Sequence, residues 1–478
     1  MKSVKVITVA ESRALEQAAD QGGLSFAQMM ENAGRATARA VEQLLPLRER
    51  RVLVLVGPRN NGGDGLVAAH YMAQMGARVT CYLWKRKAEG DAHLDRVQAG
   101  GLPVIWAEDD DGQALQGLLL AADLVVDALL GVGVSLPLRE DLRSLLAAVR
   151  SELRRPREPG ELTHAVPGLR ARPAPLVVAV DCPTGLDSDT GEVDPATLRA
   201  DLTVTFAHPK VGLLRFPGAG FVGRIVVADI GIPPSLAGEV TLEMATAETI
   251  GDWLPDRPHS AHKGTFGRLL VVAGSLNYVG AAALAGSGAK RVGAGLVTMA
   301  LPAPIQSAVA ANLAEATYLL LPHDMGVVNS GAVEVVRERM GDYDALLLGP
   351  GLSQEDETVA FVHSFLGLPR QERRGRLGFV DPSEAEGQEQ PAPPPLVIDA
   401  DGLNALSRAE GWWRLLPPGT ILTPHPGEMA RLLGGGTTTA EVQADREGIA
   451  RRMAREWNAV VVLKGALTVV AAPEGRAV

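Results

Sequence analysis

The chain has 478 residues, a hydrophobic content of 46% and a net charge of −10, so it is long enough for two domains with sizeable cores. This acidic balance and an aromatic content of only 4% argue against nucleic acid as a partner, because such sites usually need a basic surface and stacking rings. Two cysteines exclude a disulfide framework, and the sequence shows neither a signal peptide nor a membrane-spanning apolar run, which predicts a soluble cytoplasmic protein without a membrane partner.

The first half of the chain alternates predicted strands with predicted helices. Residues 11–45 show partly helical spacing of apolar side chains and are expected to be helical. Apolar strands are then expected at 52–56, 77–83, 123–127, 176–180, 202–206 and 224–228. Such strands between helices favour a parallel sheet that is covered on both faces. Residues 151–175 are rich in Arg, Glu and Pro and are interpreted as a surface insertion.

A second α/β unit is predicted to begin near His262, after a linker that follows Pro233 and Pro234. It repeats the same order of strand, glycine loop and helix. Its elements are expected at 268–273 (strand), 274–280 (loop), 281–291 (helix), and 295–299, 344–348, 396–399, 419–422, 459–463 and 467–471 (strands). Residues 367–395 are rich in Glu, Arg, Gly and Pro and are expected to form a flexible insertion.

Three polar loops follow strands of the first half. They are Asn60–Gly65, Asp127–Gly133 and Asp181–Asp187. Open α/β sheets bind ligands at the carboxyl ends of their strands, and a helix start with glycines suits an anion. The side-chain oxygens of Asn61, Asp127 and Thr184 suit a hard cation rather than zinc, and Asp181 is a candidate general base or hydroxyl acceptor. Any one loop is more simply explained as helix caps and turns, but three at one edge favour a site.

These loops carry a resemblance to a known family. Asn-Asn-Gly-Gly-Asp-Gly, Asp-Ala-Leu-Leu-Gly-x-Gly and Asp-x-Pro-Thr-Gly-Leu-Asp, in this order and preceded by Glu31-Asn32-Ala33-Gly34, resemble the NAD(P)H-hydrate epimerase domain over about residues 5–235. The resemblance implies a Rossmann-like three-layer domain at 1–235. It also implies a substrate, hydrated NADH or NADPH (NADHX and NADPHX), whose R and S forms the domain interconverts.

The resemblance also implies roles for individual residues. Asp181 would be catalytic and hold the substrate near the reacting carbon, while Asn61, Asp127 and Thr184 would ligate K+. Substrate contacts are expected at Asn60, Asn61, Gly62, Gly63, Asp64, Gly131, Val132, Gly133, Val134, Ser135, Leu136 and Pro137. Two positions depart from the family's pattern. Thr184 replaces a more usual Ser and keeps the hydroxyl, whereas Val132 replaces a common Thr and puts one contact in doubt.

Polar and glycine-rich motifs also follow the strands of the second half. They are His262-Lys263-Gly264, Ala273-Gly274-Ser275, Gly349-Pro350-Gly351, Asp399 to Asn404, Thr423 to Glu428, and Lys464 to Thr468. Lys464 at a strand end is well placed to meet a phosphate as a point charge. Alone, a Lys-Gly pair is more often a solvated turn, and a single His425 is more often structural. The ordered set favours the functional interpretation.

This ordered set resembles the ADP- or ATP-dependent NAD(P)H-hydrate dehydratase, which has a ribokinase-like fold, from about residue 258 onward; we expect this domain at 245–478. The resemblance implies ADP and Mg2+, with phosphoryl transfer to the ring hydroxyl followed by elimination. Hydrate contacts are expected at Ala282, Gly351, His425, Pro426, Gly427 and Glu428. ADP contacts are expected at Lys464, Gly465, Ala466, Leu467 and Thr468.

One part of the dehydratase pattern does not occur in this sequence. The family continues with a Gly-x-Gly-Asp helix start, whose Asp is the expected catalytic base. We therefore expect a C-terminally truncated, incomplete dehydratase domain with impaired activity beside an intact epimerase domain. Two other interpretations stay open: a ribokinase-like small-molecule kinase fused to a nucleotide-binding domain, and a non-enzymatic nucleotide-binding module. A homo-oligomer is also expected.

Overall fold

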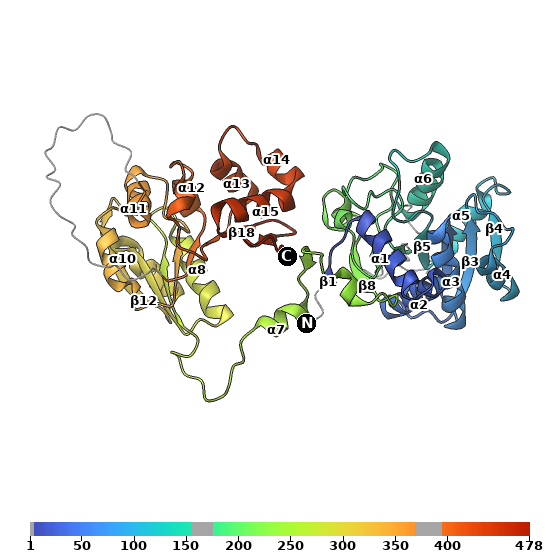
Figure 1. Cartoon of the computed structure of the whole chain (residues 1–478), viewed down its shortest axis with the longest axis horizontal. Helices are drawn as coiled ribbons and strands as arrows, with labels where there is room; N and C mark the ends of the chain where they lie inside the picture. Colours follow the sequence, from blue (N-terminus) through green and yellow to red (C-terminus); the bar gives the residue numbers. More distant parts are fainter. Residues whose placement is uncertain (1–3, 155–174, 369–393) are drawn as a thin grey trace, which may run out of the picture. The chain divides into compact units, whose positions relative to one another are not determined.

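A computed structural model describes residues 4–154, 175–368 and 394–478 (Figure 1). The chain forms two compact units, Met1–Asp252 and Trp253–Val478. The predicted insertion at 151–175 lies outside the described residues from position 155 to 174, and its first four residues end a helix. The predicted insertion at 367–395 lies outside them from 369 to 393.

The first unit is a seven-stranded parallel sheet in the order β4-β3-β2-β5-β6-β7-β8. Its strands are β2 (Arg51–Val56), β3 (Arg78–Leu83), β4 (Val104–Trp106), β5 (Leu124–Ala128), β6 (Leu176–Val180), β7 (Leu202–Phe206) and β8 (Arg224–Ala228). Its helices are α1 (Val9–Gln21), α2 (Phe26–Leu44), α3 (Asn60–Gln74), α4 (Ala92–Ala99), α5 (Gln113–Ala121), α6 (Glu140–Arg154) and α7 (Ala247–Trp253). A short ladder pairs β1 (Val4–Lys5) with β9 (Glu243–Met244). The strand order reverses direction beside β2, which is where doubly wound sheets place their ligands.

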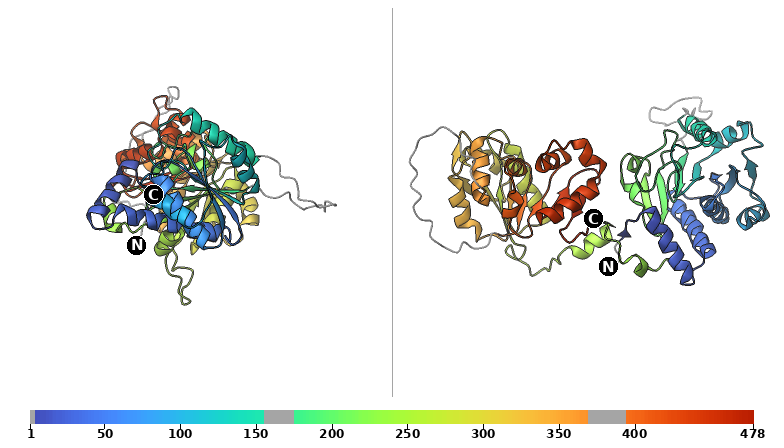
Figure 2. Two further views of the ribbon diagram at one scale, coloured as in Figure 1. Left: turned by 90° about the vertical axis from the view of Figure 1, so that its right-hand side faces the viewer. Right: turned by 45° about the horizontal axis from the view of Figure 1, so that its top comes forward.

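The side chains of each strand point alternately to the two faces of the sheet, and the helices that cover these faces complete the three layers of this unit. Val52, Val54 and Val56 of β2 belong to the cluster that contains residues of α2, α3 and α4. The intervening Leu53 and Leu55 belong to the cluster with α5 and α6. Because successive side chains of a strand point to opposite faces, one continuous apolar run supplies both cores. Figure 2 (left) shows the blue helices and the teal α6 on opposite sides of these strands.

Three details of the first unit differ from expectation. The predicted helix at 11–45 is divided, because Gly23 takes a φ of +99° and Ser25 begins α2 by accepting a hydrogen bond from the Gln28 N–H. The predicted loop Asn60–Gly65 is instead the beginning of α3, whose N-cap is Arg59. Strand β4 was not expected, since its three residues are too few for a recognisable pattern.

The second unit has an eight-stranded sheet in the order β12-β11-β10-β15-β16-β17-β18-β19, parallel except for β19. Its strands are β10 (Arg268–Val272), β11 (Leu296–Pro302), β12 (Thr317–Leu321), β15 (Ala345–Leu348), β16 (Leu396–Ile398), β17 (Ile421–Leu422), β18 (Val460–Leu463) and β19 (Val469–Ala471), with a separate hairpin of β13 (His323–Asp324) and β14 (Val327–Val328). Its helices are α8 (Val279–Val292), α9 (Gln306–Asn312), α10 (Ala332–Met340), α11 (Asp356–Leu366), α12 (Asp401–Leu406), α13 (Pro426–Leu433), α14 (Thr439–Ala444) and α15 (Arg446–Trp457). Among the described residues there are also the short 3-10 turns η1 (Val211–Leu214), η2 (Gly218–Gly220), η3 (Pro234–Ala237), η4 (Ala303–Ile305) and η5 (Trp412–Leu415).

Helices cover the second sheet on both sides as well. Val271, Val297 and Met299 pack with residues of α8 and α9 on one face, and Figure 1 shows α10 and α11 on the other side of the strands. Strands β12, β13 and β14 were not expected; two of them have only two residues, and β12 is a partly exposed edge strand. In the part of the chain that the structure describes, no helix is both long and apolar enough to cross a membrane.

Candidate functional site

The three sequence motifs of the first unit meet at the carboxyl ends of neighbouring strands. Strand β2 leads into α3, β5 ends at Ala128, and β6 ends just before Asp181. Strands β2, β5 and β6 are adjacent in the sheet, so these three chain turns lie side by side. The predicted common edge is therefore present, and the parallel register explains it.

The start of α3 approaches its neighbours so closely that only glycine fits. A Cβ on Gly62 would lie 2.0 Å from the carbonyl oxygen of Gly57, and one on Gly65 would lie 2.4 Å from the Cβ of Ala128. The Arg86 guanidinium donates to the carbonyl oxygens of Gly57 (2.8 Å) and Arg59 (3.1 Å) and thereby braces this helix start. Exposed helix N–H groups at such a start favour a negatively charged ligand.

Asp127 and Thr184 form a buried polar pair across β5 and β6. The Thr184 hydroxyl donates to Oδ1 of Asp127 at 2.6 Å, and the Thr184 N–H donates to Oδ2 at 2.9 Å. Burial raises the pKa of the Asp127 carboxyl, although the hydrogen bonds from Thr184 act in the opposite direction. The partners of this carboxylate are neutral donors, so a cation would stabilise its charged form.

Asn61 lies beside the same loop. A Cβ on Gly131 would be 2.9 Å from Oδ1 of Asn61, and the neighbouring Leu130 N–H donates to the Thr184 hydroxyl at 3.0 Å. The Asn61 amide nitrogen is buried without a hydrogen-bond partner. Buried amides normally find a partner, so the Asn61 side chain has bonding capacity that the described residues do not use. Among the described residues, no group of three or more His, Cys, Asp or Glu side chains is arranged so that it could hold a metal ion.

Asp181 is joined to a lysine that the sequence motifs did not indicate. Oδ1 of Asp181 accepts hydrogen bonds from the Lys210 ammonium (2.6 Å), the Thr205 hydroxyl (3.2 Å) and the Phe206 N–H (3.2 Å). Lys210 follows β7, the next strand beyond β6, and its side chain is only 1% exposed. Lys210 stands four residues beyond the end of β7, so the rule that selected polar residues directly at strand ends did not mark it.

Two further carboxyls share the electrostatic environment of Asp181. Burial raises the pKa of Asp64 well above its ordinary value, and the negative charges of Asp181 and Glu16 raise it further. Burial also raises the pKa of Glu16 on α1, whereas Lys210 lowers it. Glu16 comes from a helix far from every motif in sequence, so no spacing rule could have placed it here.

The residues 131–137 form the outer part of this edge. Val132 packs against an apolar cluster that includes Cys182 and Leu186, so its side chain contributes to the core. A Cβ on Gly133 would lie 2.6 Å from a guanidinium nitrogen of Arg13, which places that arginine next to the loop. Val134 and Leu136 pack on the α5–α6 side, whereas Ser135 and Pro137 are exposed. We therefore expect any contact between Val132 and a ligand to be made by the backbone of this residue.

The second unit gathers its motifs at the equivalent edge of its own sheet. Gly351 has a φ of +66°, and a Cβ there would lie 2.6 Å from the Cβ of Ala281. A Cβ on Gly274 would lie 2.9 Å from the Cβ of Ala282, and the Ser275 hydroxyl donates to the carbonyl oxygen of Gly351 at 2.9 Å. The predicted residues Ala282 and Gly351 thus belong to one tightly packed corner beside β10 and β15.

An ion-pair group occupies the ends of β16, β17 and β18. The Lys464 ammonium lies 2.6 Å from Oδ1 of Asp399 and 3.7 Å from Oε2 of Glu428. The Thr423 hydroxyl donates to the same Asp399 oxygen at 2.8 Å. His425 begins α13 as its N-cap, with Nδ1 accepting from the Gly427 N–H at 3.0 Å. The structure therefore brings His425, Glu428 and Lys464 together and adds Asp399.

The segment from Lys464 to Thr468 is a turn that one arginine supports. Arg446 at the start of α15 donates to the carbonyl oxygens of Leu463 (2.8 Å) and Leu467 (3.0 Å). The Thr468 hydroxyl donates to the carbonyl oxygen of Gly465 at 3.1 Å. Gly465, Ala466, Leu467 and Thr468 are all exposed, so their backbone is accessible to a ligand.

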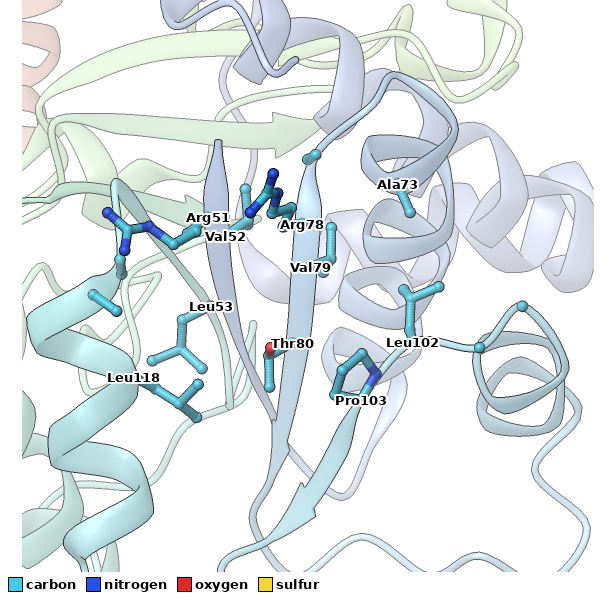
Figure 3. Close-up of a pocket in the computed structure, with 15 residues that line it drawn as sticks. Arg51, Val52, Leu53, Ala73, Arg78, Val79, Thr80, Leu102, Pro103 and Leu118 are labelled. Carbon is cyan, nitrogen blue, oxygen red and sulfur yellow. The ribbon is translucent and has the colours of Figure 1, made fainter. Parts of the chain in front are cut away.

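A cavity of about 490 Å³ lies elsewhere in the first unit, at the amino-terminal ends of β2 and β3 (Figure 3). Arg51 and Arg78, which begin these strands, line it together with Leu102 and Pro103. It therefore opens at the amino-terminal edge of the sheet. The polar motifs lie at the opposite edge, so this cavity is separate from the candidate site.

Comparisons with known proteins agree with both halves of the chain. Residues 26–212 match the family described as YjeF-related protein N-terminus, and residues 269–478 match the family described as NAD(P)H-hydrate dehydratase. The bifunctional NAD(P)H-hydrate repair enzyme Nnr of Moorella thermoacetica is 38% identical over 485 residues, covering 98% of this chain and 82% of that protein. The Escherichia coli K12 enzyme of the same name is 32% identical over 476 residues, covering 96% and 77%.

A solved structure also matches the second half. The ADP/ATP-dependent NAD(P)H-hydrate dehydratase of Bacillus subtilis, co-crystallised with ATP and Mg2+, is 30% identical and covers 48% of this chain and 70% of that chain, with a TM-score of 0.36. The assignment depends on the sequence relatives, which this chain matches over most of their length. The predicted pairing of two α/β domains with parallel sheets is confirmed, and the chain belongs to the family of bifunctional NAD(P)H-hydrate repair enzymes.

Proposed function

We propose that the first unit epimerises NADHX and NADPHX at the edge formed by α3, β5 and β6, with Asp181 as the proton-exchanging group. The observation that carries this proposal is the position of Asp181 at the carboxyl end of β6, two strands from β2 and the glycine-rich start of α3, with Asp181 and Glu16 both raising the pKa of Asp64. The helix start suits the phosphates of a dinucleotide, and the carboxyl group suits a ring hydroxyl. Family membership favours this activity over a small-molecule kinase or a non-enzymatic nucleotide-binding module.

The bonds and protons of the epimerisation can be accounted for with a single carboxylate, that of Asp181. Inversion requires the C–O bond of the hydroxyl-bearing ring carbon to break, with the electron pair leaving on oxygen, and a new C–O bond to form on the opposite face. The departing oxygen takes up a proton and leaves as water, while the incoming water releases one, and the ring carries the positive charge between these steps. The Asp181 carboxylate accepts the proton of the incoming water and passes it to solvent, which supplies the proton of the departing oxygen, so the net reaction changes only the configuration.

The contacts expected along 60–64 and 131–137 would bind the rest of the nucleotide. Backbone N–H groups at the start of α3 provide donors for phosphate oxygens. The glycines at 62, 63, 131 and 133 permit close approach of a ligand to the main chain. In this proposal Val132 contributes through its backbone, since its side chain packs against Cys182 and Leu186.

K+ fits the environment of Asn61, Asp127 and Thr184. The Asp127 carboxylate is buried among neutral donors, the Thr184 hydroxyl retains one lone pair beside the bond from Leu130, and Oδ1 of Asn61 lies next to Gly131 in the neighbouring loop. Oxygen ligands of this kind suit a hard cation. When bound, K+ would supply the charge that offsets Asp127 and order the loops beside Asp181.

For the second unit we propose ADP-dependent dehydration of the S hydrate, with ADP beside residues 464–468 and the hydrate beside Ala282, Gly351, His425 and residues 426–428. The relative from Bacillus subtilis is named as ADP/ATP-dependent and was crystallised with ATP and Mg2+, which supports the use of a nucleotide and Mg2+ here. Asp399 and Glu428 are carboxylates of the type that Mg2+ prefers. The impaired dehydration expected from the sequence stays a prediction, as does a homo-oligomer.

These activities belong to a chain that we propose acts in the cytoplasm. Cys81 and Cys182 are both free and buried, which fits a reducing compartment. Burial raises the pKa of each thiol to about 12, so neither is a candidate nucleophile.

The test of the epimerase proposal uses separated R and S hydrates of NADH and NADPH. The full chain should accelerate their equilibration, and KCl should increase the rate more than NaCl at equal ionic strength. Tight binding of the hydrates without any acceleration would instead support a binding module. The dehydration proposed for the second unit is measured in the same samples as the amount of intact NADH or NADPH formed, compared with and without ADP and Mg2+.

A further inference from the structure

We propose that Lys210 is a positioning residue for the epimerisation: it fixes Oδ1 of Asp181 and leaves Oδ2 to exchange the proton with the substrate. The inference rests on the proposed function, because it takes Asp181 as the carboxyl group that meets the hydrated ring. It concerns a residue outside every motif that first pointed to the site.

The two oxygens of Asp181 have different surroundings. Oδ1 accepts from Lys210 at 2.6 Å, from the Thr205 hydroxyl at 3.2 Å and from the Phe206 N–H at 3.2 Å. Within the described residues, no hydrogen bond to Oδ2 is found. A carboxylate whose one oxygen already has three donors has its other oxygen available for a ligand.

The hydrogen bonds of Lys210 account for all three of its ammonium protons. Nζ donates to Asp181 Oδ1 (2.6 Å), to the carbonyl oxygen of Phe206 (3.1 Å) and to the Thr205 hydroxyl (3.3 Å). An ammonium has three donors, so none remains for a substrate oxygen. With a side chain only 1% exposed, Lys210 acts through Asp181 rather than by direct contact.

The backbone at Asp181 and at Ala207, which precedes Lys210, adopts a conformation that residues other than glycine rarely take. Asp181 has a φ of +64°, and the Cys182 N–H donates to the Val180 carbonyl oxygen at 2.8 Å across it. Ala207 has a φ of +58°, with an equivalent bond of 2.6 Å from the His208 N–H to the Phe206 carbonyl oxygen. Such tight three-residue turns are rare and unfavourable for residues other than glycine.

These two turns follow the ends of β6 and β7, which pair directly in the sheet. Asp181 stands just beyond β6, and Lys210 stands four residues beyond β7. Strained backbone of this kind persists where surrounding contacts over-determine it, and it is concentrated at functional sites. A buried lysine that served only stability would be a costly choice, since well-packed apolar side chains often stabilise equally well. The combination therefore favours a role in positioning Asp181.

The test compares Lys210→Met, Asp181→Asn and the double variant in the full chain, with Lys5→Met as the control. Lys5 forms a 2.7 Å ion pair with Glu243 in the β1–β9 ladder of the same unit, so its loss removes a comparable pair outside the site. Lys210→Met should lower kcat for epimerisation by about 10- to 100-fold, as supporting contacts of reactive groups do, and should change KM less than threefold. Lys5→Met should leave kcat unchanged.

The double variant separates positioning from direct action. If Lys210 acts through Asp181, adding Lys210→Met to Asp181→Asn should produce no further loss of kcat. It should also raise the melting temperature relative to Asp181→Asn alone, because the unpaired buried ammonium is removed. A multiplicative loss of kcat, or a rise in KM at constant kcat, would overturn the proposal.

A milder variant covers the case in which Lys210→Met does not fold. Thr205→Val preserves shape while removing one donor to Asp181 and one acceptor of Lys210, and it should lower kcat several-fold at constant KM. An unchanged kcat in folded Thr205→Val and Lys210→Met, with an inactive Asp181→Asn, would reject only the role of Lys210. An active Asp181→Asn would reject the proposed function itself.

Discussion

The two units each place a lysine against an aspartate at the carboxyl edge of a parallel sheet, but they do so in different environments. Lys210 is 1% exposed and has three acceptors, so it is a permanent partner of Asp181. Lys464 is 39% exposed and bridges Asp399 and, more distantly, Glu428. Burial converts an ion pair into a fixed scaffold, whereas exposure leaves the ammonium able to exchange its carboxylates for a phosphate.

The largest expected effect concerns the carboxylate of the buried pair. Asp181→Asn should lower the epimerisation rate by about 10²- to 10⁴-fold, the usual contribution of a positioned general acid or base. The measurement is the equilibration of separated R hydrate. Asp123→Asn is the matched control, because Asp123 lies next to β5 at the opposite, amino-terminal edge of the same sheet. Equal losses in the two variants would indicate a general effect on folding.

The stability of the two lysine pairs should differ strongly. Lys210→Met should destabilise the first unit by about 3–5 kcal/mol, since it leaves Asp181 buried without its cation. Lys464→Met should cost at most about 1 kcal/mol in the second unit, as for other solvent-exposed pairs. Hydrogen exchange followed peptide by peptide separates the two units. Similar protection losses in both would show that burial is not what distinguishes the pairs.

The Asp127–Thr184 pair provides a smaller effect. Thr184→Val keeps the side-chain shape but removes the 2.6 Å donor to a buried carboxylate, so it should cost about 1–3 kcal/mol. Thr184→Ser keeps the hydroxyl and should be close to neutral. Activity titrated with KCl should show a K+ response in the Ser variant and none in the Val variant. A K+ response that survives in Thr184→Val would exclude this hydroxyl as a ligand.

The exposed lysine should matter for nucleotide affinity. Lys464→Met should weaken ADP binding about tenfold, corresponding to about 1.4 kcal/mol, as measured by calorimetry with Mg2+ present. Lys290→Met is the control, because Lys290 on α8 approaches Glu315 at 3.9 Å in the same unit. Unchanged ADP affinity in Lys464→Met would mean that its carboxylate partners retain the lysine when the nucleotide binds.

The smallest effect is a change in pH dependence at Glu16. Burial raises its pKa above the ordinary value of 4.5, so the protonated form is favoured in the folded state. The stabilisation is complete below pH 4.5 and is lost as the pH rises through the raised pKa. The glutamine side chain of Glu16→Gln does not ionise. The melting temperature of this variant minus that of the original chain, measured at the same pH, should therefore increase from pH 4.5 upward. A constant difference between pH 4 and pH 8 would contradict the shift.

Most of the sheet architecture could be predicted from sequence, and the reason is visible in β2 and β10. Both are apolar runs followed by glycine-rich turns, and burial on both faces of a parallel sheet selects such runs. The short strands β4 and β17 show where that signal weakens. Strand β17 was recognised by the Thr-Pro motif after it, whereas β4 has no such marker.

The residues of the candidate sites also fall into those that the sequence indicated and those that it did not. Asn61, Asp127, Asp181 and Thr184 stand directly at strand ends, so their common edge follows from the parallel topology. Lys210 stands four residues beyond its strand, Glu16 comes from α1, and Asp399 was part of a motif without an assigned partner. Spacing along the chain cannot reveal a contact between segments that meet only in the folded state.

Strand periodicity and turn residues act locally, so the amino-acid pattern was enough to predict two parallel α/β units with polar loops at one sheet edge each. Only the tertiary structure decided how those side chains combine. It paired Asp181 with Lys210, brought Glu16 into the electrostatic environment of Asp64, and placed two carboxylates near Lys464. The physical reason is that burial and charge interactions depend on distances between distant segments, and these distances exist only once the sheets have assembled.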